Sequence, residues 1–111
     1  MRDWLARLGE LLAHGPVAVV TVLSAEGSTP REVGAKMLVT RDTIEGTIGG
    51  GALEFQAIAD ARSMLADARP WQRRTIEVPL GPAVQQCCGG FVRLLLEAVT
   101  ADQQTMIASV T

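Results

Sequence analysis

The stretch VAVVTVL at residues 17–23 is a continuous apolar run of strand length, rich in β-branched side chains. Such a run is typical of a central strand that is buried on both of its faces. In the preceding segment, residues 3–13, Trp4 and the leucines recur with the spacing of one helical face. His14-Gly15-Pro16 ends that pattern, because glycine can cap a helix and proline cannot continue it. The sequence therefore predicts a helix followed by a buried strand.

The rest of the chain is divided by turn-forming residues and by changes of period. A change from alternation to helical spacing follows Gly49-Gly50-Gly51, and Pro79 is typical of an edge strand. The expected elements are strands over residues 36–40 and 43–48, a helix from about residue 51 to 68, and strands over 74–80 and 91–99. The sequence predicts a single α/β domain over residues 1–100, with a mixed sheet covered by helices in the order α-β-β-β-α-β-β. Residues 101–111 are expected to form a loose tail.

The composition narrows the class of protein. Among 111 residues, 48% are hydrophobic and 20% are charged, which is typical of a folded domain with a packed core. The net charge of −2 argues against a general nucleic-acid binder. No apolar run reaches the roughly 18 residues that span a bilayer, and the N-terminus does not resemble a signal peptide, so we expect a cytoplasmic protein without a membrane segment.

A turn rich in hydroxyl groups separates the first two predicted strands. Its sequence is Gly-Ser-Thr-Pro-Arg-Glu-Val-Gly, residues 27–34. The hydroxyls of Ser28 and Thr29, the guanidinium of Arg31 and backbone N–H groups could together bind an oxyanion. A plain proline-containing connection with solvated charges is the alternative.

A second candidate lies where a strand passes through three glycines into a helix, at residues 47–54 (TIGGGALE). Gly49, Gly50 and Gly51 would let a phosphate approach the backbone, and the helix start favours negative charge. Glu54 occupies the position at which a dinucleotide fingerprint has its third glycine, so a Rossmann assignment is weak. The alternative is a tight turn with Glu54 as a favourable acid in the first helical turn.

The third candidate is Gln-Gln-Cys-Cys-Gly-Gly at residues 85–90, directly before the last predicted strand. A disulfide between the adjacent Cys87 and Cys88 would be strained, so free thiols are expected. Thiolates can bind thiophilic metals or carry sulfur, whereas a free cysteine can also be a small buried hydrophobe. With His14 as the single histidine and no G-x-S-x-G sequence, the chain offers little for a zinc site or for hydrolysis.

Taken together and in this order, the three segments resemble the xanthine dehydrogenase accessory (XdhC/CoxI) family, in its N-terminal domain. The similarity runs from Pro16 to about Glu97. It is carried by Gly-Ser-Thr-Pro-Arg-Glu-x-Gly-Ala-x-Met-Leu-Val at 27–39, Gly-Thr-Ile-Gly-Gly-Gly-x-Leu-Glu at 46–54 and Cys-Gly-Gly at 88–90.

The resemblance implies a maturation factor and not an enzyme. Such a chaperone would bind the molybdenum cofactor (molybdopterin), protect its terminal sulfur and deliver it to xanthine dehydrogenase in cooperation with a cysteine desulfurase. A homodimer is compatible with this role. The cofactor-binding residues would be Ser28, Thr29, Arg31, Gly49, Gly50, Gly51, Glu54 and Cys88, with Cys87 and Cys88 as candidate metal ligands. A protein-docking module without a cofactor site and a nucleotide- or NAD-binding oxidoreductase fragment are the alternatives.

We expect at least one of Cys87 and Cys88 to be a reduced thiol that solvent can reach, because a thiol sealed in the core cannot meet a metal or accept sulfur. Neighbouring residues on an extended strand point to opposite faces, and Cys88 is favoured because it belongs to the Cys-Gly-Gly pattern. Thiol labelling of the native protein measures this. Slow modification of both cysteines, with cofactor binding unchanged in Cys87→Ala and Cys88→Ala, would identify them as core residues.

Overall fold

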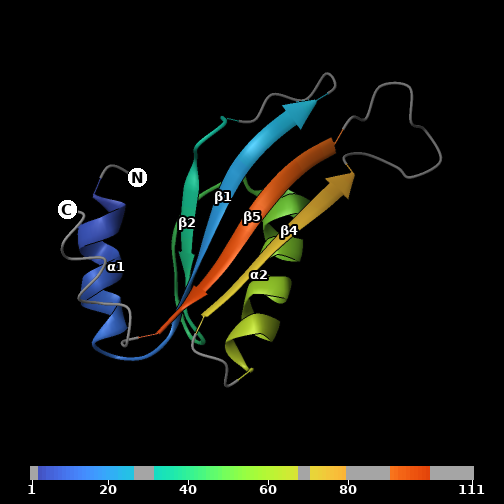
Figure 1. Ribbon diagram of the computed structural model, residues 1–111. Coiled ribbons are helices and arrows are strands. Elements are labelled where there is room, and N and C mark those ends of the chain that lie inside the picture. Colours follow the sequence, from blue (N-terminus) through green and yellow to red (C-terminus); the bar gives the residue numbers. More distant parts are fainter. Residues whose placement is uncertain (1–2, 27–31, 68–70, 80–90, 101–111) are drawn as a thin grey trace.

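The computed structural model describes residues 3–26, 32–67, 71–79 and 91–100, which form two helices and five strands (Figure 1). The predicted α/β class and the predicted element order are confirmed. In chain order the elements are α1 (Trp4–Leu12), β1 (Val17–Glu26), β2 (Lys36–Val39), β3 (Ile44–Gly46), α2 (Gly51–Leu65), β4 (Trp71–Pro79) and β5 (Phe91–Val99). The proposed tail at residues 101–111 lies outside the described residues.

The strands form one sheet in the order β3-β2-β1-β5-β4, with β1 in the middle. Every neighbouring pair is antiparallel, so the strand directions are not mixed as the sequence suggested. The physical reason is that α2 carries the chain from one edge, β3, to the other edge, β4, and no two parallel strands become neighbours. The edge position predicted for the strand with Pro79 is confirmed.

β1 is buried along most of its length, as the apolar run predicted. Val17, Ala18, Val20 and Val22 are at most 1% exposed, whereas Leu23 is 40% exposed. The register between β1 and β5 shifts between Val22 and Ser24, which places Leu23 in a β-bulge. The bulge interrupts the alternation and turns this one leucine toward solvent.

The larger hydrophobic core lies between the sheet and α2, which packs behind the sheet in the view of Figure 1. Along β5, every second residue faces this core, and all four are fully or almost fully buried. The helix contributes the side chains that recur at helical spacing. The buried members include Val92, Leu94, Leu96 and Ala98 from β5 and Leu53, Ala57, Ala61, Met64 and Leu65 from α2.

The shorter helix α1 covers part of the opposite sheet face, so the sheet lies between the two helices (Figure 1). Leu8 and Leu12 pack there against Val17, Val19, Leu38 and Val99. Arg7 ties α1 to β3, because its Nε lies 2.7 Å from Glu45 Oε1 and its Nη2 lies 2.6 Å from Glu45 Oε2. This is a bidentate pair, the geometry that fixes orientation best.

In the described part of the chain, neither helix has the length and apolar character needed to cross a membrane.

The Arg7–Glu45 pair predicts a specific pH dependence of stability. Hydrogen bonds from the Arg7 guanidinium lower the pKa of the Glu45 carboxyl below its ordinary value. A carboxyl with a depressed folded-state pKa stabilises the fold above its unfolded-state pKa of about 4.3, and that contribution is lost as the pH falls through the folded-state value. The melting temperature of Glu45→Gln should therefore lie below that of the wild type at pH 7, and the difference should shrink in acid.

Thermal unfolding followed by circular dichroism between about pH 3 and pH 7, the range in which carboxylates titrate, measures this difference. Glu10→Gln is the control, because Glu10 contacts the same guanidinium through one exposed 3.3 Å bond. A difference between wild type and Glu45→Gln that does not change with pH would contradict the assignment.

Candidate functional site

The glycine turn between β3 and α2 needs glycine for the conformation of its backbone. Gly49, Gly50 and Gly51 all have positive φ, at 121°, 76° and 68°. Gly50 combines this φ with a ψ of −172°, a region that only glycine adopts readily. A Cβ built on Gly50 or Gly51 would meet no atom within 4 Å. The requirement is thus conformational, and the space beside the turn is open.

The carboxylate of Glu54 holds this turn together from the first turn of α2. Its Oε2 accepts hydrogen bonds from the Gly50 N–H at 2.9 Å and from the Ile48 N–H at 3.2 Å. The Thr47 hydroxyl donates to the same oxygen at 2.6 Å and accepts from the Gly49 N–H at 3.1 Å. The turn is therefore a receptor for a carboxylate oxygen, and the chain supplies that oxygen itself.

This geometry gives Glu54 a structural task in addition to the predicted binding role. From the sequence, Glu54 is a predicted cofactor-binding residue and Thr47 is not. A Ser or Thr close before a helix with an acid in its first turn is the known signal of reciprocal capping, but at a spacing of three residues. Thr47 and Glu54 are seven residues apart, because the glycine turn folds back between them.

The start of α2 keeps further backbone donors. The N-cap residue Gly50 has no side chain that could accept from the helix, and Gly51, Ala52 and Leu53 contribute the N–H groups of its first turn. These groups and the helix dipole favour an anion. A bound anion would also meet the negative charge of Glu54, so a cation is needed nearby. Arg31 is the sequence candidate for that cation, and it lies outside the described residues.

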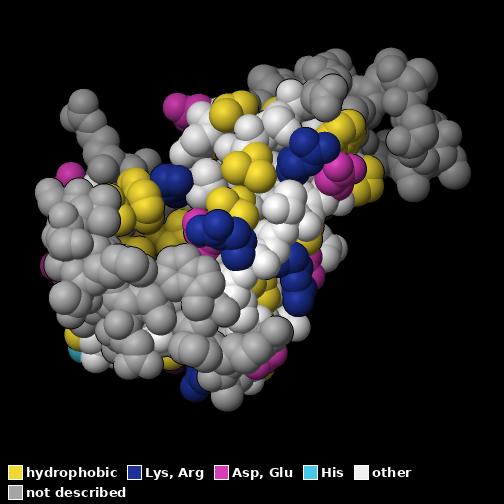
Figure 2. Space-filling model, in the orientation of Figure 1, with side chains coloured by type: hydrophobic (Ala, Val, Ile, Leu, Met, Phe, Trp, Pro, Cys, Tyr) yellow, Lys and Arg dark blue, Asp and Glu magenta, His cyan; other side chains and the backbone are white. Residues whose placement is uncertain are grey.

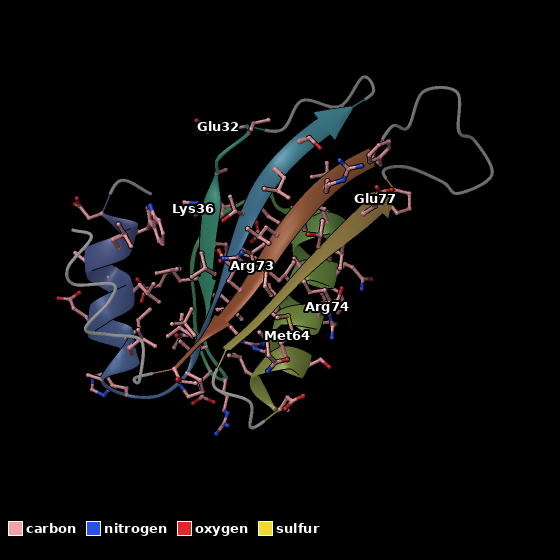
Figure 3. All side chains as sticks on the ribbon, in the orientation of Figure 1. Glu32, Lys36, Met64, Arg73, Arg74 and Glu77 are labelled. Atoms are coloured by element: carbon pink, nitrogen blue, oxygen red, sulfur yellow. The ribbon has the colours of Figure 1, made fainter. Side chains whose placement is uncertain are left out.

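The segments with the other predicted site residues leave the sheet at neighbouring strand ends. Glu26, the last residue of β1, pairs with Phe91, the first of β5, which pairs in turn with Pro79, the last of β4. Segments 27–31 and 80–90 therefore connect to one end of the sheet, here called the loop end. Figure 3 places Glu32 there, and Figure 1 shows α2 beginning toward the same end.

Five predicted site residues lie in those two segments, outside the described residues: Ser28, Thr29, Arg31, Cys87 and Cys88. We expect Ser28 and Arg31 to share one concave surface with the glycine turn, with the Cα atoms of Arg31 and Gly50 no more than about 20 Å apart. Within the described ranges, no group of three or more His, Cys, Asp or Glu side chains could hold a metal ion. That finding does not bear on the two cysteines.

The described cavities lie at the opposite end of the sheet. One has a volume of about 510 Å³ and is lined by residues around His14 and by the β2–β3 turn at Thr40–Thr43. The other, of about 280 Å³, adjoins it at Pro16 and Arg41 and reaches the end of α2. Among the residues that the structure describes, neither cavity is lined by one from the three sequence segments. The functional site is assigned to the loop end together with the start of α2, because the unusual backbone and its donors lie at that helix start and α2 begins toward the loop end.

The model of the XdhC and CoxI family matches residues 11–76, more than half of the chain. This chain belongs to the XdhC and CoxI family. The matched range contains the segment 27–34 and the whole glycine turn with Glu54, and it ends before the cysteine segment.

The XdhC/CoxI chain is similar to parts of two larger proteins. Over 56 residues it is 41% identical to the uncharacterized protein YqeB of Escherichia coli (strain K12). That match covers 50% of this chain and 10% of YqeB. A crystal structure described as a xanthine dehydrogenase from Bacillus halodurans superposes with a TM-score of 0.69 at 28% identity, over 93% of this chain and 32% of the other. The chain thus spans about a third or less of these relatives.

The glycine turn predicts opposite effects of two glycine-to-alanine changes. Gly50→Ala should lower the free energy of unfolding by about 1–3 kcal/mol, because an L-residue is strained at this φ and ψ. Gly9→Ala, inside α1, should raise it by up to about 1 kcal/mol, because alanine suits a helix better. An added Cβ meets nothing within 4 Å at either position, so crowding does not confound the comparison. Urea unfolding measures both; equal effects would contradict the proposed backbone strain.

Proposed function

We propose that this chain is an accessory factor of the xanthine dehydrogenase system that binds the sulfurated molybdenum cofactor and assists its insertion into the enzyme. Membership of the XdhC and CoxI family supports the accessory role. The main support for a cofactor site is the register of β1, β5 and β4 at the loop end. There the connections that contain Arg31 and the two cysteines start from directly paired residues, and α2 begins toward the same end.

The chemistry of the described residues suits an anionic cargo. The cofactor carries a phosphate, and the glycine turn already receives an oxyanion, the Glu54 carboxylate, through two backbone N–H groups. The adjoining N–H groups of the first turn of α2 offer the same chemistry to a phosphate oxygen. Arg31 would neutralise the combined negative charge, and Cys87 or Cys88 would supply a soft ligand toward molybdenum or its sulfur.

The role of a carrier follows from what this set of residues can do. Backbone N–H groups and a guanidinium hold an anion without changing it, and a thiol can shield a labile sulfur ligand from solvent. Xanthine dehydrogenase would be the recipient of the cofactor, and a cysteine desulfurase would be the source of its sulfur. The name of the Bacillus halodurans relative is consistent with the first of these partners.

Cofactor retention tests this function. The protein is incubated with molybdenum cofactor released from a molybdenum hydroxylase, separated by gel filtration and analysed for molybdenum per chain. We expect co-elution at a defined stoichiometry with the wild type. Arg31→Ala and Cys88→Ala should each reduce retention.

Arg41→Ala is the matched control, since it removes the same guanidinium group from the β2–β3 turn at the cavity end of the sheet. It should retain cofactor as the wild type does. Loss of retention in Arg41→Ala with no loss in Arg31→Ala would move the site to the cavities. Absence of retention by the wild type, with binding to xanthine dehydrogenase intact, would favour a docking module instead.

A further inference from the structure

β4 forms one edge of the sheet and offers a long strand for pairing. It runs over nine residues, Trp71–Pro79, and in the described part of the chain its only strand neighbour is β5. The backbone N–H and C=O groups along an edge are a template for another strand. Proline, which cannot donate a hydrogen bond, stands only at the last position, so the central part of the edge is able to pair.

Charged side chains follow this edge in a regular order on the sheet face opposite α2. Arg73 Nη2 lies 2.9 Å from Glu97 Oε2, and Arg93 Nη2 lies 2.8 Å from Glu77 Oε2, each pair joining β4 to β5. Arg73 and Glu77 keep 61% and 56% of their side chains exposed. Figure 2 shows basic and acidic side chains next to each other on this face, and Figure 3 marks Arg73 and Glu77 along β4.

The order of these charges is self-complementary. Arg73 and Glu77 stand two residues before and two residues after Thr75. If two copies of β4 pair in antiparallel fashion about a two-fold axis at Thr75, each Arg73 lies opposite the Glu77 of the other copy. Each copy also keeps its own pairs between β4 and β5. Across the four strands the charges then alternate, with Glu97 and Arg73 from one copy followed by Glu77 and Arg93 from the other, and this row occurs once on either side of the axis. Opposite charges directly across a sheet stabilise it.

From this pattern we infer that β4 is the pairing edge for a second copy of this chain, centred on Thr75. The symmetry makes both contacts identical, as in other two-fold dimers. Backbone hydrogen bonds would supply the attachment, and the charge rows would fix the register. With the axis at Arg74, Arg73 would lie opposite Thr75. With the axis at Ile76, it would lie opposite Pro79, and neither arrangement pairs Arg73 with an acid. The inference is independent of the proposed function, because neither Arg73 nor Glu77 belongs to the candidate site.

The test uses two single charge reversals. In Arg73→Glu both contacts across the axis become acid against acid, and in Glu77→Arg both become base against base. Either variant alone should associate at least about tenfold more weakly than the wild type, because each reversal opposes like charges at both contacts. A mixture of the two variants restores both opposite-charge contacts and should form a heterodimer. Sedimentation equilibrium gives the dissociation constants, and native mass spectrometry identifies the mixed species.

Arg74→Glu is the matched control, because it makes the same charge change on the neighbouring residue of β4, opposite Ile76 in the paired strand. It should dimerise like the wild type. Circular dichroism melting checks that every variant is folded, since each reversal also breaks one pair with β5. A monomeric wild type, dimers of unchanged strength in both reversals, or a mixture that stays monomeric would each overturn the inference.

Discussion

The antiparallel pairing of β1 with β5 is the interaction on which the rest of the structure depends. The two strands stay paired from Val17 opposite Val99 to Glu26 opposite Phe91, with one β-bulge at Leu23. Both strands are interior strands of the sheet, and their side chains supply buried residues to the faces covered by α1 and by α2. Shifting this register by one residue would exchange the faces of a whole strand, so the apolar pattern fixes it strongly.

That register also determines where the chemistry of the molecule can be. Because β1 and β4 end where β5 begins, the segments that follow and precede them share one end of the sheet. α2 crosses from one edge to the other and begins toward that end, after a turn that glycine alone can form without strain. Two segments that are remote in sequence are thereby attached to one end of the sheet, and the start of α2 points toward that end, an arrangement compatible with one cargo.

The sequence predicted the elements well because their periods are distinct. VAVVTVL and FVRLLLEAV are apolar at strand length, and both strands lie in the sheet as expected. β4 starts three residues before the predicted boundary at Arg74. Trp71-Gln72-Arg73 shows no clear apolar–polar alternation, and the buried side chain of Gln72 donates to the Met64 carbonyl, a contact that depends on the tertiary fold.

The candidate site could be predicted only in part. The glycines at 49–51 indicated an anion-friendly turn, and the structure shows it receiving an oxyanion. The sequence did not reveal that Glu54 provides that oxyanion or that Thr47 orients it, because both depend on how far the turn folds back. The exposure of Leu23 likewise comes from a β-bulge that the local sequence pattern does not predict. Periodicity reports which side is buried, whereas side-chain capping depends on distances across the fold.

The proposed cofactor site of this chain lies at the loop end and the start of α2. Backbone amide NMR of the protein during titration with molybdenum cofactor tests it most directly, because each region of the chain reports separately. Binding at the proposed site should give chemical-shift changes concentrated at Gly49–Gly51 and in residues 27–31 and 85–90, with Thr40–Thr43 unaffected. Changes centred on His14–Pro16 and Thr40–Thr43, the cavity end of the sheet, would contradict it.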